Sequence, residues 1–544
     1  MHLLTNMAEK KNLIFYNIYM KKIFTLLVSA LFAVTVSATD YKGPLSVSLN
    51  GSTTPSGETT VSYTEGTDGT CDLSLKNFSF ADMPIGTINL KGVAMDKKPL
   101  TSVFGDKKTI VIDKGDDTTV KTWFGPEMGP MQIFVKGIVQ NGKLNAVILI
   151  DMTASKLGII KVLFGKHADE VGQIANSGFE RFHNQSIGSA KGVEPDGWHS
   201  FLSCDGSLAA VAAGSHREVS NDVCPGSTSK QSVKVFSTAI KIFGISKSAN
   251  GTISTGRISA GSATESDPAN HSYIDMSKTD RDGAGDPFYT ALVARPDAIS
   301  AWVKYVPGKS GITASMSAVI TDGTYYQDPE DPKVEYKNVC SKASDTAIGT
   351  NGGKWQKITL PFDYANMDAN ADLKARAILL TMSTCSVPGG GSKDKNKPDC
   401  LYIGDVELVY NYLPTSISYD GKELQAFDAS KNGYSISGRG DFDVSKLTSV
   451  VNAKDYATSV SIGEEENGVL PVYYSFISGD YQNTMTYTIN YTNLETSAIN
   501  GMNASTKKSA AGIYDLSGRR VKYDNQHGIY IVRTADGKTF KIKK

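Results

Sequence analysis

The chain has 544 residues, and its 56 basic side chains are balanced by 56 acidic ones, so its formal net charge is zero. This length is enough for about three to five domains that each bury a core. The neutral charge argues against a nucleic-acid-binding protein, which would present a basic surface. Many Gly, Ser, Thr and Tyr residues with only short apolar runs favour an all-β fold class.

Residues 1–38 have the features of a secretory signal peptide that starts at Met20. Lys21-Lys22 precede the apolar run 23–36, which ends in the small-x-small sequence Val36-Ser37-Ala38. The alternative, a short membrane anchor, is disfavoured because the apolar segment is shorter than a bilayer span. We therefore expect cleavage after Ala38 and a secreted or outer-surface chain with no transmembrane segment.

Residues 40–165 alternate between apolar and polar positions in short runs, of which Leu45–Leu49 is the first. This alternation predicts a β-meander or a β-barrel. The apolar phase shifts across Lys76-Asn77, which predicts a β-bulge. Asn141-Gly142 lies between two alternating runs and suits a type I′ hairpin turn.

The same stretch resembles the calycin-like β-barrel domains of secreted bacterial proteins. The resemblance lies in the Tyr-x-Gly-x-Leu-x-Val opening, Tyr41–Val47, and in the segment Leu75–Phe80. It implies a barrel that either holds a ligand or is filled by its own side chains.

Residues 174–411 form the longest segment. It begins with the N-x-G-F-E motif Asn176–Glu180, continues with Gly197-Trp198, and ends with Leu401–Leu408. This order resembles jelly-roll carbohydrate-binding modules, and more narrowly the "putative carbohydrate metabolism domain" family of secreted bacterial proteins. The resemblance implies a β-sandwich that binds a polysaccharide or another glycan.

The resemblance also implies a structural calcium ion. Glu180 and Asp405 would meet where the first and last strands of the jelly roll come together, and a hard cation there would gather carboxylate and backbone oxygens. The family usually has two aspartates at the second position, whereas this chain has Gly404-Asp405. The alternative is that both side chains are simply solvated acids.

Glycan binding requires exposed aromatic rings and polar groups that match sugar hydroxyls. Tyr325, Tyr326 and Gln327 offer this chemistry in a polar stretch, and we expect Tyr364 to join them. The alternative is that these tyrosines only flank strands. We assign the tryptophans that neighbour apolar strand positions to the core: Trp198, Trp302 and Trp355.

Six cysteines are present, and export makes disulfides possible. Cys204/Cys224 and Cys385/Cys400 each bracket a loop and are predicted to form two bridges. None of the cysteines forms a C-x-x-C pair, which argues against a zinc site.

Two further segments follow. Residues 413–495 contain short, aromatic, alternating runs that predict an immunoglobulin-like β-sandwich. Residues 510–544 resemble the C-terminal sorting domain of the type IX (Por) secretion route, through the blocks Tyr514–Val521 and Gly528–Val532 and a basic end. The resemblance implies the type IX secretion machinery as a partner.

The sequence lacks the common catalytic motifs, including G-x-S-x-G, H-E-x-x-H and the phosphate-binding loop. A catalytic carboxylate pair is not identifiable, because its spacing depends on the fold. We therefore predict an exported, non-catalytic glycan-binding protein of a bacterial cell surface that takes part in polysaccharide capture. Two alternatives stay open: a glycoside hydrolase with its site in the central domain, and a structural or adhesive surface protein.

Overall fold

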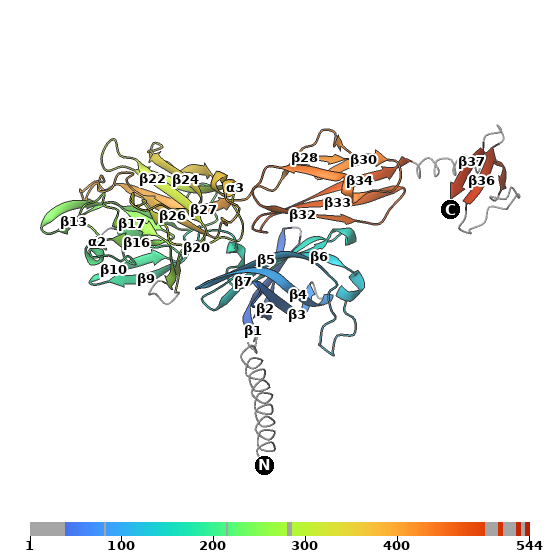
Figure 1. Cartoon of the computed structure of the whole chain (residues 1–544), viewed down its shortest axis with the longest axis horizontal. Helices are drawn as coiled ribbons and strands as arrows, with labels where there is room; N and C mark the ends of the chain where they lie inside the picture. The colour runs from blue at the N-terminus through green and yellow to red at the C-terminus, as the bar shows by residue number, and fades with distance from the viewer. Residues whose placement is uncertain are drawn as a thin grey trace, which may run out of the picture.

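The computed structural model describes residues 38–49, 51–80, 83–213, 216–279 and 285–494, and the backbone of three strands after residue 509. The predicted signal peptide, apart from Ala38, lies outside the described residues. The fold is all-β, as predicted, and consists of three domains in chain order and a small C-terminal sheet (Figure 1). No helix of the described part is long and apolar enough to cross a bilayer.

The first domain is a closed barrel of eight antiparallel strands, in which each strand pairs with the next and β1 closes onto β8. Alternate residues such as Ile133 and Val135 are fully buried inside it, together with Phe104 and Leu90. The barrel interior is therefore packed by its own side chains. The strands are β1 Thr39–Leu49, β2 Ser52–Glu65, β3 Thr70–Phe80, β4 Met83–Lys98, β5 Thr101–Ile110, β6 Met131–Gln140, β7 Lys143–Met152 and β8 Gly158–Phe164.

Two local predictions for the barrel are confirmed. The register between β3 and β4 shifts between Leu75 and Phe78, where Asn77 has a φ of 53°. The β6–β7 hairpin turns at Asn141 and Gly142, whose φ values are 51° and 66°. Positive φ at both positions is the requirement of a type I′ turn, which Asn and Gly meet at low cost.

The second domain is a β-sandwich of two facing sheets. One sheet has the order β11-β12-β27-β21-β25, and the other has the order β15-β26-β22-β24 with β20 paired to β26. The strands are β11 His216–Ser220, β12 Ser232–Phe236, β15 Thr252–Ser254, β20 Thr290–Ala291, β21 Ala298–Val306, β22 Ala314–Thr321, β24 Val339–Ile348, β25 Gln356–Pro361, β26 Ala377–Ser383 and β27 Cys400–Val409.

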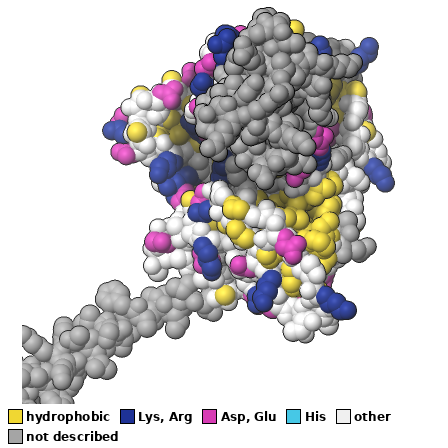
Figure 2. Space-filling view, turned by 90° about the vertical axis from the view of Figure 1, so that its right-hand side faces the viewer, with side chains coloured by type: hydrophobic (Ala, Val, Ile, Leu, Met, Phe, Trp, Pro, Cys, Tyr) yellow, Lys and Arg dark blue, Asp and Glu magenta, His cyan; other side chains and the backbone are white. Residues whose placement is uncertain are grey.

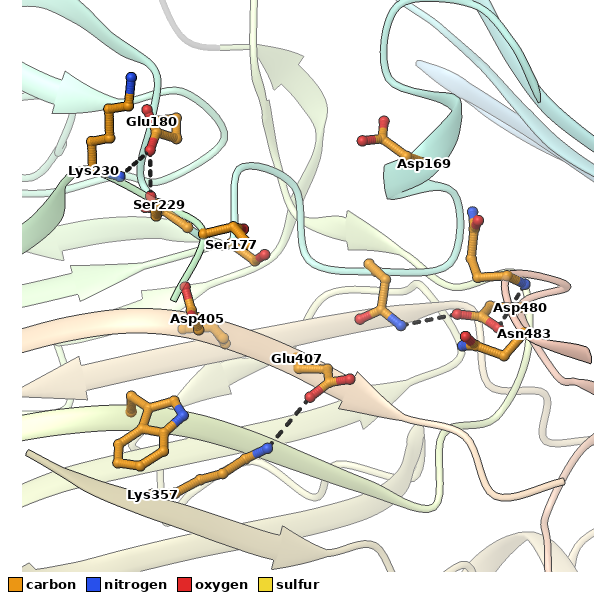
Figure 3. A pocket seen from close by; sticks show the side chains of 16 residues that line it. Asp169, Ser177, Glu180, Ser229, Lys230, Lys357, Asp405, Glu407, Asp480 and Asn483 are labelled. Carbon is orange, nitrogen blue, oxygen red and sulfur yellow. Dashed lines mark hydrogen bonds and ion pairs between the residues drawn. The ribbon is translucent and has the colours of Figure 1, made fainter. Parts of the chain in front are cut away.

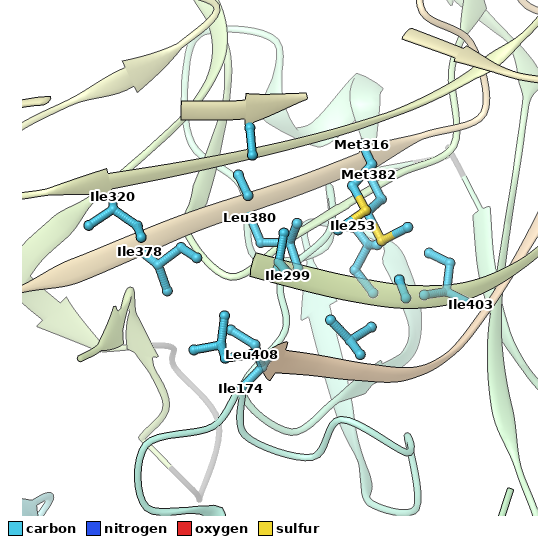
Figure 4. Packing of buried hydrophobic residues seen from close by; sticks show 14 of the residues in the cluster. Ile174, Ile253, Ile299, Met316, Ile320, Ile378, Leu380, Met382, Ile403 and Leu408 are labelled. Atoms are coloured by element: carbon cyan, nitrogen blue, oxygen red, sulfur yellow. The ribbon is translucent and has the colours of Figure 1, made fainter. Parts of the chain in front are cut away.

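The core of the sandwich lies between the two sheets (Figure 4). Ile299 and Ile403 come from the first sheet, and Met316, Leu380 and Met382 from the second; all five are fully buried. Short pairs of strands surround the sandwich: β9 Phe182–Ile187 with β10 Ala190–Pro195, β13 Thr238–Ile242 with β14 Ile245–Ala249, β16 Arg257–Ala260 with β17 Asn270–Tyr273 and β23 Gln327–Asp328, and β18 Asp275–Thr279 with β19 Pro287–Phe288.

The helices are short and lie in connections. They are α2 Ala209–Ala212 and α3 Ala365–Ala369, with the 3₁₀ turns η1 Gly125–Met128, η2 Thr153–Ser155, η3 Ala168–Glu170 and η4 Val444–Lys446.

The third domain also consists of two sheets packed on one core. Their orders are β29-β28-β31 and β30-β34-β33-β32, with β30 parallel to β34. The core contains Tyr487, Phe476 and Ile489, all fully buried. The strands are β28 Pro414–Tyr419, β29 Lys422–Glu423, β30 Gly433–Gly438, β31 Leu447–Val451, β32 Tyr456–Ile462, β33 Val469–Ser478 and β34 Thr484–Asn493.

The three domains pack against one another. Phe134 on the outside of the barrel contacts Tyr481 of the third domain, with ring centroids 5.8 Å apart. Lys136 of the barrel donates to the carbonyl oxygen of Val293 in the second domain, at 3.0 Å, and to that of Gly479 in the third. Lys136 is therefore a hydrogen-bond donor shared by all three domains.

The predicted sorting tail contains three antiparallel strands in the order β35-β36-β37: Ala510–Tyr514, Ile529–Thr534 and Thr539–Lys543. Residues 515–528, which hold most of its motif, lie outside the described residues. Figure 2 looks at the molecule from this end, and acidic and basic side chains are interspersed over the face that is not grey.

Candidate functional site

The strongest candidate site is a groove of about 500 Å³ on the outer face of the second sheet of the sandwich. Residues that alternate with the buried Ile253, Met316 and Met382 face outward on this sheet, because side chains alternate along a strand. These outward residues are all serines or threonines. Those that line the groove floor are Thr252, Ser315, Ser317, Ser344, Thr381 and Ser383.

The strand register places these hydroxyl groups in two rows across the sheet. Ser383 pairs with both Thr252 and Ser315. Thr381 pairs with Ser317, which pairs with Ser344. The floor therefore offers a two-dimensional set of hydrogen-bond donors and acceptors about one strand spacing apart, roughly 4.8 Å.

The groove walls differ in character. On one side, side chains near α2 and on β13 supply an apolar surface: Phe201, Leu208, Val211, Ile240 and Ile242. On the other side, Asn270, His271 and Asp328 supply polar atoms. A polar floor with one apolar wall suits a ligand that has both hydroxyl groups and apolar faces.

Two titratable groups of the groove, Asp328 and His271, are shifted toward their neutral forms. Burial raises the pKa of Asp328, which also accepts a hydrogen bond from Ser317. Burial lowers the pKa of His271, so this ring is neutral near pH 7. Its Nδ1 lies 2.8 Å from the carbonyl oxygen of Pro268 and donates to it, which leaves Nε2 as an acceptor.

Tyr325 does not line the groove itself, but it lies beside His271, which does. Its side chain is 53% exposed. Its hydroxyl donates to Oε1 of Gln327 at 2.9 Å and lies 3.4 Å from Nε2 of His271. Tyr273 contacts the ring at a centroid distance of 5.8 Å. These contacts hold an exposed aromatic ring in one orientation, as a stacking platform requires.

The other three residues predicted to contact a glycan are buried, so the prediction is wrong for them. Tyr326 is 1% exposed because it packs in an apolar cluster against Tyr336. Tyr364 is fully buried, and its hydroxyl donates to the carbonyl oxygen of Pro296. Gln327 is also buried, and its amide nitrogen donates to backbone carbonyl oxygens. Gln327 therefore positions Tyr325.

Glu180 and Asp405 line a second hollow, of about 710 Å³, between the sandwich and the third domain (Figure 3). The two ends of the sandwich meet there, because the amide of Val406 donates to the carbonyl oxygen of Ser177. Glu180 accepts from Ser229 at 2.7 Å, and Asp405 accepts from Ser227 at 2.8 Å. Both carboxylates are therefore tied to one loop, and calcium binding stays a prediction.

The tryptophans divide between core and surface. Trp198 is fully buried, as predicted. Trp302 is only half-buried and lines the hollow of Glu180 and Asp405. Trp355 is also half-buried, and its indole nitrogen donates to Asp222 at 2.9 Å. The core assignment was therefore wrong for Trp302, whose strand β21 has one face outside the sandwich core, and for Trp355, which immediately precedes β25.

One cluster of the described residues has the ligand types of a metal site. One ligand atom each from His183, Asp196 and Asp286 lies within 4.8 Å of the others. Nδ1 of His183 is 3.0 Å from Oδ1 of Asp196, and this hydrogen bond is the main cause that lowers the pKa of Asp196. Nδ1 of His183 and the carboxylate of Asp196 therefore already form a hydrogen-bonded pair.

The two predicted disulfides are not formed in the structure. All six cysteines are free. Cys204 points to the carbonyl oxygen of Phe201, whereas Cys224 points to the carboxylate of Asp405. Cys385 and Cys400 are also separate thiols, and burial raises the pKa of both. Proximity in sequence misled the prediction because each loop places its two cysteines in different packing environments.

The hydroxyl floor was missed by sequence reasoning, although a signal was present. Serine or threonine alternates with buried apolar residues at one end of each of two strands: Ser315 and Ser317 in Ala314–Thr321, and Thr381 and Ser383 in Ala377–Ser383. A strand end with only small hydroxyl residues on its outer face is a candidate ligand surface. The register of the strands is needed to show that these hydroxyls align.

The family model of the calycin-like beta-barrel domain matches residues 37–166. A comparison with curated proteins gives no significant match. Among solved structures, the chain is similar to the K1 cleaved adhesin domain of Lys-gingipain from Porphyromonas gingivalis, with 10% identity, 42% of this chain and 94% of that chain covered, and a TM-score of 0.20. It is also similar to a Bacteroides fragilis protein described as a "putative outer membrane protein", with 11% identity, 64% and 96% coverage, and a TM-score of 0.17.

Proposed function

We propose that the chain is an exported, non-catalytic protein of a bacterial cell surface that binds a glycan in the groove of its central sandwich. The observation that carries this proposal is the floor of aligned serine and threonine hydroxyls facing an apolar wall. Sugar rings have hydroxyl groups around their edges and apolar patches of C–H groups on their faces. The hydroxyl side chains of the floor match the sugar hydroxyls, and the apolar side chains of Phe201 and Ile240 match the C–H faces. The exposed ring of Tyr325, beside the lining residue His271, offers a further apolar face.

The expected affinity is modest. A stacked aromatic ring contributes about 1 kcal/mol beyond area burial. Hydrogen bonds between neutral groups contribute about 1 kcal/mol each, because both partners leave water. A few such contacts give dissociation constants on the order of micromolar to millimolar. Binding in this range is useful on a repeating polymer, where several copies of the protein act together.

The proposal includes the route of export. The segment up to Ala38 supports signal-peptide cleavage, and the C-terminal blocks support recognition by type IX secretion machinery. A chain that reaches the cell surface would meet polysaccharides before any cytoplasmic substrate. This placement agrees with a role in polysaccharide capture.

Titration of the full chain against a panel of soluble oligosaccharides tests the proposal. Tyr325→Ala should weaken the best-bound glycan by about fivefold, the loss expected for one stacking contact. Tyr456→Ala is the matched control, because Tyr456 is 41% exposed on the third domain. If Tyr325→Ala and the unchanged protein bind the glycan with equal affinity, Tyr325 does not contact it. Binding of no glycan at all would reject the function.

We also propose that calcium binds beside Glu180 and Asp405. Their carboxylates and the carbonyl groups of the meeting strand ends are the oxygen ligands that calcium prefers. The melting temperature should rise with calcium and fall with a chelator, because a ligand that binds only the folded state stabilises it. The double variant Glu180→Gln/Asp405→Asn should lose this response. Equal melting temperatures of the unchanged protein in calcium and in chelator would contradict the proposal.

A further inference from the structure

The hairpin formed by β13 and β14 carries an exposed apolar tip that the glycan groove does not use. Ile240 and Ile242 face the groove, whereas Phe243 and Ile245 at the turn are 87% and 62% exposed. β13 lies at the left end of the molecule in Figure 1, far from the C-terminal sheet. The tip is therefore free to contact another surface.

The backbone conformation of this turn is unfavourable for Phe243. Ile242 pairs with Ile245, so Phe243 and Gly244 form the two-residue turn, with φ values of 50° and 80°. Both positions of such a turn favour Asn, Asp or Gly, and a bulky side chain with positive φ is strained. At this position the phenylalanine is strained and its ring is exposed. The fold of the isolated chain does not account for its presence.

Basic side chains surround the apolar tip. Lys241 is exposed next to Ile242, and Lys393 donates to the carbonyl oxygen of Ser246, which pairs with Lys241 close to the turn. The loop of Lys393 also presents Val387, which is 61% exposed, and accepts a hydrogen bond from Ser248 at Gly391. The hairpin and this loop together contain five lysines, Lys241, Lys247, Lys393, Lys395 and Lys397, against the exposed Asp394 and the buried Asp399. Lys247 is paired with Glu265 at 3.0 Å, which leaves four lysines for an anionic surface.

We propose that this tip docks on an anionic lipid surface, with Phe243 and Ile245 in the interfacial region and the lysines at the headgroups. Apolar side chains flanked by lysines match the two layers of a membrane surface. Each lysine near an anionic surface adds attraction that salt weakens. A purely apolar pocket of a protein partner would not need the surrounding lysines. The proposal does not depend on glycan binding.

Co-sedimentation of the full chain with lipid vesicles tests the proposal. The unchanged protein should bind vesicles that contain phosphatidylglycerol, and binding should weaken in high salt and on vesicles of phosphatidylcholine alone. Phe243→Asn should reduce binding about tenfold, because the aromatic side chain is lost. Asn favours positive φ, so this variant should fold at least as well as the unchanged protein. Its melting temperature verifies folding.

Two further variants complete the experiment. Lys241→Gln/Lys393→Gln should reduce binding to the anionic vesicles about tenfold or more while leaving the apolar tip intact. Phe124→Asn, at a phenylalanine that is 39% exposed on the barrel, should bind like the unchanged protein. The proposal is rejected if the unchanged protein binds neither kind of vesicle. It is also rejected if Phe243→Asn and Phe124→Asn bind equally.

Discussion

Replacing Lys136 with methionine should loosen the packing of the three domains, with a loss of about 1–3 kcal/mol in the free energy of unfolding at pH 7. The variant keeps the aliphatic stem but removes the donor to the carbonyl oxygens of Val293 and Gly479. A buried acceptor that loses its donor keeps its desolvation cost, which is the source of this magnitude. Lys136 also lies over the ring of Tyr481, at 4.7 Å.

The deficit of this variant should grow as pH rises. Burial lowers the pKa of Lys136 in the folded protein to about 8 from the ordinary 10.5, despite the nearby Asp455 and Asp480. Between these pH values the unfolded chain binds the extra proton, so the lysine's contribution to stability increases with pH. The increase is up to about 3 kcal/mol.

Denaturant unfolding of both proteins at pH 7 and pH 10 measures this difference. Buried tyrosines behave in the opposite way, because burial raises the pKa of Tyr481 to about 12 and its contribution falls at high pH. The tyrosines are present in both proteins, so their effect cancels in the difference between the two free energies of unfolding. A difference that stays constant from pH 7 to pH 10 would contradict the assignment of a buried, proton-releasing lysine.

Removing two floor hydroxyls should weaken glycan binding about a hundredfold. Thr252→Val/Thr381→Val keeps the branched shape that suits β-strands but removes two hydrogen-bonding groups from the groove. A sugar hydroxyl left without its partner costs about 1–3 kcal/mol, and 1.4 kcal/mol is a factor of ten in affinity. The loss of affinity is larger than that expected for Tyr325→Ala. In the double variant, sugar hydroxyls would give up their hydrogen bonds to water without gaining hydrogen bonds to the protein.

The matched control is Thr359→Val, on the exposed face of β25 in the other sheet. Isothermal titration of the full chain with the best-bound oligosaccharide compares the three proteins. The control should bind like the unchanged chain. If the double variant keeps full affinity while the control also does, the floor of the groove does not contact the ligand.

Local sequence signals predicted the barrel well. The alternation of Leu45–Leu49, the bulge at Asn77 and the turn at Asn141-Gly142 depend on residues close in the chain, and the structure has all three features. The pairing of β1 with β8, which closes the barrel, joins residues more than a hundred positions apart. Such closure follows from the resemblance to calycin-like domains and not from periodicity.

The site was harder to predict for the same reason. The chemistry of Tyr325 and Tyr326 is identical in the sequence, but their side chains lie on opposite sides of the chain, so one is exposed and the other is buried. Thr252, Ser317 and Thr381 lie on three strands, and only the strand order brings them together. The role of Lys136 between the domains could not be predicted, because its acceptors belong to two other domains. The sequence of its own strand does not indicate how whole domains pack.

A crystal structure of the chain with its best-bound oligosaccharide tests the central claim most directly. We expect sugar hydroxyls to bond to Thr381 and Ser317 on the groove floor, with one ring against Tyr325. A sugar bound in the hollow beside Trp302 and Glu407, with the hydroxyl floor empty, would contradict the account.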